Sequence, residues 1–238
     1  MRIAAEIKDW LRVIHKVLIE TKYFCIGLVR SFEHFGVRVR TVVKEHFCEK
    51  KFGIITTGCS LFNDIISLHR DGVAYQPTPY GILEKTMNYL RPGPEDVFVD
   101  LGCGKGKAVF FAAEQNFKKV IGVELRKELA DIALQNLKSL KIKHAPVEII
   151  NTDVSLFDLK DGTIFFMFNP FGQDTLMKVV DNIKASLLAS PRRIRIVYYG
   201  GGHQGLLDKE EWLEYQGAAV ENTVRVWSNK DNTIKITP

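Results

Sequence analysis

Two kinds of apolar pattern alternate along residues 80–199. Short apolar runs of five or six residues are separated by longer segments in which apolar residues recur every three or four positions. The short runs are typical of strands buried on both faces, and the longer segments are typical of amphipathic helices. The pattern predicts helices over residues 80–90, 107–115, 126–141 and 175–188, and strands over residues 96–101, 119–124, 147–151, 163–168 and 194–199. This order favours a parallel sheet covered by helices on both faces.

Both ends of the chain depart from this alternation. Residues 218–227 and 233–237 are joined by the polar sequence 228–232, which predicts an antiparallel hairpin at one edge of the sheet. Near the N-terminus, apolar residues at helical spacing predict an amphipathic helix over about residues 2–20. Before residues 80–90, Thr78 is expected to be the N-cap and Pro79 the first helical residue.

The net charge of +5 is carried by the N-terminal fifth of the chain. Residues 1–51 contain eleven Lys or Arg against six Asp or Glu, whereas residues 52–238 contain 22 of each. We therefore divide the chain into a basic amphipathic helical extension, 1–51, and a balanced domain, 52–238. Such an extension can contact a membrane surface, nucleic acid or an acidic partner. The interpretation we favour is that it packs its apolar stripe on the neighbouring domain.

Composition excludes several broad classes. With 238 residues, 46% of them apolar and 26% charged, the chain can bury a core and is neither disordered nor fibrous. No apolar run approaches the ~20 residues that a membrane-spanning helix needs, so no transmembrane segment is expected. Glu6, Lys8 and Asp9 interrupt any signal-peptide apolar region. We expect a cytoplasmic protein.

The cysteines give no sign of a disulfide framework or a metal site. Cys25, Cys48, Cys59 and Cys103 show no paired spacing. His46 stands two residues before Cys48, but a full set of four ligands is not evident. We expect reduced thiols and no metal.

The chemistry concentrates in the turn that follows the strand 96–101. Asp100 is followed by Gly102, Gly104 and Gly106, so glycine occupies every second position before the next helix. Glycines let the backbone approach a ligand closely, and the helix N-terminus beyond them presents unpaired N–H groups. Lys107 stands where a dinucleotide-binding turn needs its third glycine, and it is not followed by the Ser or Thr of a phosphate-binding loop.

This turn resembles motif I of the class I S-adenosylmethionine-dependent methyltransferases, the D-x-G-x-G-x-G loop that wraps the methionine half of the cofactor. The resemblance implies that Asp100 belongs to the cofactor site and that Glu124, at the end of the second strand, accepts hydrogen bonds from the ribose hydroxyls. It implies that Leu125 lies against the adenine ring and that Asp153 accepts from the adenine amino group. It also implies that the segment around Thr78 closes over the cofactor.

The same resemblance implies a Rossmann-like, doubly wound α/β fold with a seven-stranded, mostly parallel sheet and the antiparallel hairpin at its end. The core, including residues 52–58, 104–107 and 168–171, looks like a bacterial branch of this class whose substrate is not defined. A looser likeness to protein lysine methyltransferases comes from the tyrosine-proline segment that precedes motif I.

Several of these residues have a purely structural alternative. Asp153 can be a turn former, since Asp is common after strands, and Thr78 can be a packing or capping residue. Lys105 and Lys107 can meet the cofactor carboxylate or be solvated loop lysines, and we favour the second reading.

The candidate acceptor site lies at the end of the fourth parallel strand. Asn169 and Phe171 resemble the Asn and the aromatic residue of amino-group methyltransferases, in which the amide oxygen accepts from the target N–H and the ring stacks on a planar group. That motif has two prolines, whereas only Pro170 is present here, which shifts the spacing by one residue. The alternative is an ordinary strand-to-helix turn. Tyr198 and His203 follow on the same carboxyl edge, where ligands bind in such sheets.

The sequence therefore predicts an S-adenosylmethionine-dependent N-methyltransferase with Asn169 and Phe171 as catalytic residues. The expected acceptor is a protein lysine or another macromolecular amine, and the balanced core gives no indication of nucleic acid. Two alternatives stay open: a cofactor-binding module that acts through its basic N-terminal segment, and a small-molecule methyltransferase.

Overall fold

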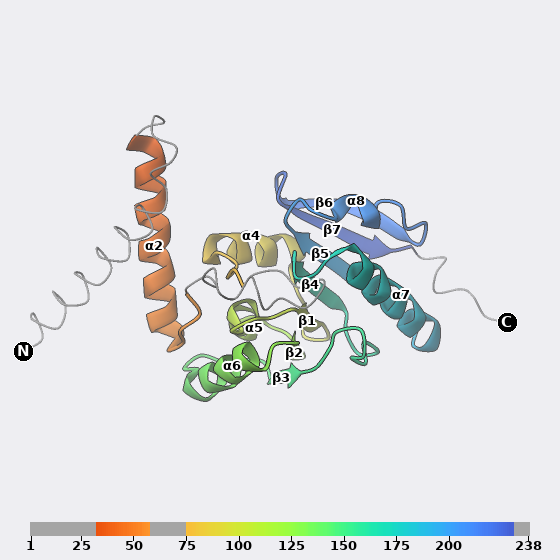
Figure 1. Ribbon diagram of the computed structural model, residues 1–238, viewed down its shortest axis with the longest axis horizontal. Coiled ribbons are helices and arrows are strands. Elements are labelled where there is room, and N and C mark those ends of the chain that lie inside the picture. Colours follow the sequence, from red (N-terminus) through yellow and green to blue (C-terminus); the bar gives the residue numbers. More distant parts are fainter. Residues whose placement is uncertain (1–31, 58–74, 231–238) are drawn as a thin grey trace, which may run out of the picture.

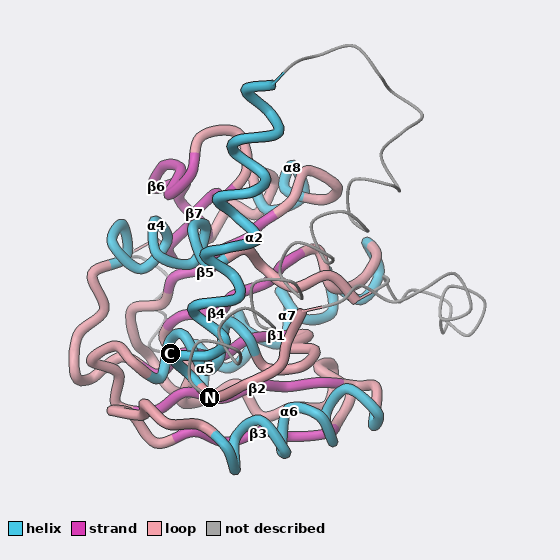
Figure 2. The backbone as a smooth tube through the Cα atoms, turned by 90° about the vertical axis from the view of Figure 1, so that its left-hand side faces the viewer, coloured by secondary structure: helices cyan, strands magenta, loops and turns pink. Residues whose placement is uncertain are grey.

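A computed structural model describes residues 32–57 and 75–230 of the 238-residue chain. Its centre is one seven-stranded sheet in the order β3-β2-β1-β4-β5-β7-β6. Figure 2 shows the strands following one another in this order from β3 to β6. The parallel strands are β1 (Val97–Leu101), β2 (Lys119–Glu124), β3 (Val147–Asn151), β4 (Ile164–Phe168) and β5 (Arg195–Tyr199), and the antiparallel strands are β6 (Leu213–Val220) and β7 (Val224–Asn229).

Helices cover both faces of the sheet. The helices of the described chain are α2 (Phe32–Phe52), α4 (Tyr80–Leu90), α5 (Lys107–Ala113), α6 (Lys127–Ser139), α7 (Gln173–Ala189) and α8 (Gln204–Leu207). Figure 1 shows α4 and α5 on one side of the sheet and α7 on the other. Alternate residues of β1 divide accordingly: Phe98 packs with apolar residues of α4 and α5, whereas Val97 and Val99 pack with those of α7. Each side thus has its own apolar core, because side chains alternate across a strand.

The fold class expected from the sequence is confirmed. The helix 80–90 and the strands 119–124 and 147–151 have the bounds predicted, and the other parallel strands and their helices differ by one or two residues at their ends. The carboxyl ends of β1, β2 and β4 meet at one edge of the sheet, and this edge carries the candidate site.

The position predicted for the hairpin is wrong. Its turn lies at residues 221–223, where Asn222 has a φ of +56°, and its first strand begins at Leu213. Ser228 and Asn229, read as turn residues, are buried in β7. Asn229 Oδ1 accepts from the Ile194 N–H at 2.8 Å, so its polar side chain is satisfied inside the sheet. The predicted strand 233–237 lies outside the described residues.

The N-terminal extension enters the described structure as α2, whose C-terminal end reaches α4 and α5 (Figure 1). The division placed between residues 51 and 52 falls one residue before the end of this helix. Phe52 is buried and stacks on Tyr80, with ring centroids 5.9 Å apart. The last two turns of α2 are therefore packed on the domain. The helix predicted over residues 2–20 lies outside the described part of the chain.

The capping prediction for α4 is also corrected. Pro79 is the N-cap residue, and no side-chain cap comes from Thr78, which is buried. The Tyr80 N–H instead donates to Glu45 Oε1 of α2 at 2.8 Å. A carboxylate brought from 35 residues away thus satisfies one of the free N–H groups of this helix end. Across residues 32–57 and 75–230, no helix is long and apolar enough to cross a membrane.

Candidate functional site

The glycine turn has the backbone conformation that its residues predict. Gly102 and Gly104 have φ angles of +91° and +56°, a region that residues with a side chain rarely adopt. A Cβ on Gly104 would stand 2.3 Å from the Tyr75 ring, and a Cβ on Gly102 would stand 2.5 Å from Pro170 Cβ. The turn is therefore in contact with two other parts of the predicted site: the segment before α4 and the turn after β4.

Asp100 and Glu124 come together beneath the glycine turn from the neighbouring strands β1 and β2. Their side chains are buried, with 4% and 6% exposure. Glu124 Oε2 accepts from the Gly104 N–H at 2.8 Å, and Oε1 accepts from the Arg126 N–H at 2.9 Å. Burial raises the pKa of Asp100 well above its usual value, and the charge of Glu124 adds to this rise. Burial also raises the pKa of Glu124, against the effect of the two N–H donors.

The two residues expected at the adenine differ in their surroundings. Leu125, directly after β2, is 50% exposed. Asp153 Oδ1 accepts from the Ser155 N–H at 2.8 Å, the geometry of a turn-forming Asp. Asn151, which the sequence reading missed, donates through Nδ2 to the carbonyl oxygens of Glu124 and Leu125 at 2.9 and 3.0 Å. It ties the end of β3 to the end of β2.

Asn169 is held in an uncommon conformation at the end of β4. Its φ is +40°, and its side chain lies close to Gly200 and Gly202 of the loop after β5. The Tyr198 hydroxyl donates to Asn169 Oδ1 at 3.0 Å. Tyr198 is fully buried, so its hydroxyl holds the Asn169 amide in a fixed orientation, a contact that residue spacing alone does not predict. A strained backbone held by its neighbours is a frequent property of functional residues.

Phe171 is more deeply buried than Asn169 and Pro170 before it. It is 7% exposed and packs in the core on the α7 side of the sheet. Its position is that of a packing residue, and the stacking role expected for it is not supported by the geometry. Phe168 and Tyr199, the last residues of β4 and β5, are stacked with ring centroids 4.1 Å apart and pack against the core on the α4 side. His203 is half-buried at the start of α8.

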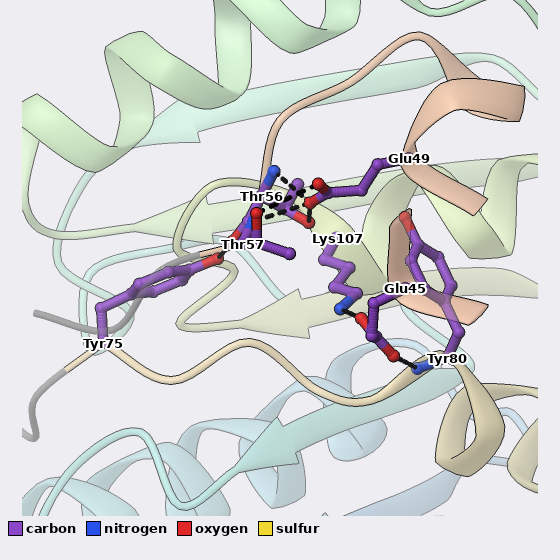
Figure 3. A network of polar contacts seen from close by, with 7 residues as sticks. All are labelled: Glu45, Glu49, Thr56, Thr57, Tyr75, Tyr80 and Lys107. Carbon is purple, nitrogen blue, oxygen red and sulfur yellow. Dashed lines mark hydrogen bonds and ion pairs between the residues drawn. The ribbon is translucent and has the colours of Figure 1, made fainter. Parts of the chain in front are cut away.

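The two loop lysines are not simply solvated. Lys107 is 3% exposed, forms an ion pair with Glu45 and lies over the Tyr80 ring at 4.3 Å (Figure 3). Lys105 Nζ lies over the Tyr75 ring at 4.9 Å and donates to the Thr57 carbonyl oxygen at 3.3 Å. The reading of these lysines as free loop residues is therefore corrected. In the described parts of the chain, no group of three or more His, Cys, Asp or Glu residues is arranged to hold a metal ion.

A solved structure shows the same fold. The RNA methyltransferase from Salinibacter ruber, solved in complex with S-adenosyl-L-homocysteine, superposes on 66% of this chain and 95% of its own with a TM-score of 0.52 and 20% identity. The chain has the class I methyltransferase fold. Its seven-stranded, mostly parallel sheet with the antiparallel β6–β7 pair is the sheet that the resemblance to these methyltransferases implied.

Sequence comparisons point to lysine methyltransferases. Residues 73–164 match the family model described as histone methylation protein DOT1. The chain is 35% identical over 130 residues to the histone H3 lysine-79-specific N-methyltransferase of Dictyostelium discoideum, covering 47% of this chain and 7% of that protein. It is 30% identical over 97 residues to a protein-lysine N-methyltransferase of Saccharolobus islandicus, covering 40% of this chain and 60% of that protein. The matched part thus spans less than two thirds of either relative.

Proposed function

We propose that the protein is an S-adenosylmethionine-dependent methyltransferase whose acceptor is the ε-amine of a protein lysine. The observation that carries the proposal is that the DOT1 match, residues 73–164, contains the glycine turn together with Asp100 and Glu124. Both relatives described above are named as lysine methyltransferases. The proposal retains the cytoplasmic location expected from the sequence.

The residues present fit the cofactor. Gly102, Gly104 and Gly106 carry no side chain of their own at the carboxyl end of β1, where the methionine half would lie, and their positive φ angles shape the turn there. Glu124 has two carboxylate oxygens that each accept one N–H and can each accept another donor, as ribose hydroxyls require. The exposed Leu125 side chain offers an apolar face for the adenine. Asp153 and Thr78 complete the proposed set of cofactor-binding residues. Bound there, S-adenosylmethionine supplies an electrophilic methyl group.

The protein's own task is to orient the acceptor and to exclude water. Transfer requires a neutral amine whose lone pair points at the methyl carbon. Asn169 Oδ1 is proposed to accept an N–H of the amine, which directs its lone pair, and the Tyr198 hydroxyl holds the amide in place. Phe168 and Tyr199 are stacked at the carboxyl ends of β4 and β5, and an aliphatic lysine chain can pack on this aromatic pair.

The cofactor part of the proposal is tested by calorimetry with S-adenosylhomocysteine. We expect the wild-type chain to bind it and Glu124→Ala to lose at least about a hundredfold in affinity, since two hydrogen bonds to a charged group are removed. The matched control is Glu128→Ala, because Glu128 is an exposed glutamate in the first turn of α6. Equal binding by wild type and Glu124→Ala would contradict the assignment.

The alternative of a catalytically silent module acting through the basic segment predicts a different result. Such a protein binds the cofactor but transfers no label from a radioactive methyl donor to any component of a lysate. The Salinibacter neighbour is named as an RNA methyltransferase. If the acceptor of this chain is a nucleic acid, nuclease removes the transferred label and protease does not.

A further inference from the structure

The last turn of α2 holds the segment that follows it through one carboxylate. Glu49 Oε1 accepts from the Thr56 N–H at 2.6 Å, from the Thr56 hydroxyl at 2.8 Å and from the Thr57 N–H at 2.6 Å, and Oε2 accepts from the Thr57 hydroxyl at 3.1 Å. Figure 3 shows both threonines turned toward this carboxylate. Glu49 is buried, so these donors are shielded from water. The backbone of residues 56 and 57 is therefore fixed relative to α2.

This segment in turn supports the glycine turn of the proposed cofactor site. The Thr56 carbonyl oxygen accepts from the Tyr75 hydroxyl at 2.7 Å, and the Tyr75 ring lies directly against Gly104. The Thr57 carbonyl oxygen accepts from Lys105, the residue after Gly104. Residues 56 and 57, whose N–H groups donate to Glu49, thus accept through their carbonyl oxygens from Tyr75 and from Lys105.

A second contact joins the same two segments. Asn136 of α6 donates through Nδ2 to the carbonyl oxygens of Ile55 and Lys105, both at 3.1 Å, and accepts from the Ile55 N–H at 3.0 Å. Residues 55–57 and the glycine turn are therefore linked through Asn136 as well as through Tyr75 and Lys105.

We propose that Glu49 is a positioning residue for the cofactor: by fixing residues 56 and 57 it holds the Tyr75 ring and Lys105 in the arrangement that binds S-adenosylmethionine. The inference rests on the proposed function. It makes the end of the N-terminal extension a part of the cofactor site, although α2 contributes no residue to the set predicted from the sequence. Anything that displaces the last turn of α2 is expected to weaken cofactor binding.

The direct test compares variants of the full chain by calorimetry with S-adenosylhomocysteine. Glu49→Ala leaves two buried N–H groups without their acceptor, so we expect Kd to rise about tenfold. Glu49→Gln keeps the oxygen that accepts three of the four bonds, and its Kd is expected within about threefold of wild type. The matched control is Lys44→Ala, which removes an exposed ion pair between α2 and Glu84 of α4 and is expected to leave Kd unchanged.

A double-mutant cycle separates positioning from general destabilisation. If Glu49 acts through Thr56 and Tyr75, removing the Tyr75 hydroxyl breaks the route. Tyr75→Phe alone is expected to raise Kd about fivefold, and Glu49→Ala added to it is expected to raise Kd by less than about threefold more. A tenfold effect of Glu49→Ala in both backgrounds would overturn the proposal, because a structural loss is additive.

The outcomes remain separable if a variant is unstable. Should Glu49→Ala not fold by circular dichroism, Tyr75→Phe still decides, since it leaves α2 intact and an unchanged Kd overturns the proposal. If Glu49→Ala binds S-adenosylhomocysteine with the same affinity as the wild-type chain, this inference alone is overturned. Failure of the wild-type chain to bind overturns the proposed function, and the inference with it.

Discussion

Lys107 offers the sharpest stability prediction, because a charged side chain lies almost fully buried at the start of α5. It is 3% exposed, its ion-pair partner Glu45 is 14% exposed, and its ammonium lies 4.3 Å from the centre of the Tyr80 ring. Removing one partner of a buried pair leaves the other charge without compensation and costs about 3–5 kcal/mol. Glu45 keeps some solvent and its bond to the Tyr80 N–H, so we expect Lys107→Met to cost about 2–4 kcal/mol.

The assay is unfolding by urea, followed by circular dichroism, together with thermal unfolding. A loss of about 2–4 kcal/mol lowers the melting temperature of a chain of this size by about 4–16 °C. The matched control is Lys118→Met, since Lys118 is 62% exposed and pairs with Glu95 at 3.4 Å. It is expected to change the free energy of unfolding by less than about 0.5 kcal/mol.

The double variant Glu45→Gln/Lys107→Met tests the cause. With both charges removed, no ion is left buried alone, so the combined loss should fall short of the sum of the single losses by about 1–3 kcal/mol. A Lys107→Met protein as stable as Lys118→Met, or a double variant whose losses add, would refute the reasoning.

Three further predictions follow from the site. Gly104→Ala is expected to weaken S-adenosylhomocysteine binding more than tenfold, because its Cβ meets the Tyr75 ring at 2.3 Å. The control Gly81→Ala has open space around it in α4 and should stabilise the fold by about 0.5–1 kcal/mol. Equal effects of the two variants on binding would contradict this. Tyr198→Phe should lower kcat about fivefold through the lost bond to Asn169 and leave cofactor Kd unchanged, so a change in Kd alone would argue against it. Burial raises the pKa of Asp100 in the folded state, so the stability that the protonated Asp100 contributes is present below its unfolded pKa and is lost as pH rises through its folded pKa. Asp100→Asn should therefore raise the melting temperature of the cofactor-free protein at neutral pH more than at pH 4. A larger rise at pH 4 would contradict the direction of the pKa shift.

The sheet could be predicted because its signal is local. The strands β1 and β2 are short, mostly apolar runs whose residues are nearly all buried, and a strand buried on both faces needs little more than that pattern. The hairpin was misplaced for the converse reason. Ser and Asn are common in turns, which is why the sequence predicts Ser228 and Asn229 as turn residues. Asn229 is instead buried in β7, where its side chain accepts from the N–H of Ile194 just before β5, a partner that local pattern does not reveal.

The candidate site divides in the same way. The glycine turn, Asp100 and Glu124 lie within 25 residues of one another, and a motif of that length can be read directly. The burial of Lys107 depends on Glu45, 62 residues away, and the support of the glycine turn depends on Glu49 and Asn136. Such contacts come from the packing of α2 and α6 on the domain, so spacing along the chain could not indicate them.

Methyl transfer to a protein lysine is tested by mass spectrometry of a lysate incubated with the protein and methyl-deuterated S-adenosylmethionine. We expect deuterated methyl groups on lysine Nε in the digested protein fraction, present with the wild-type chain and absent with Glu124→Ala. Deuterated methyl groups found only in nucleic acid or small molecules, or found nowhere although the cofactor binds, would contradict it.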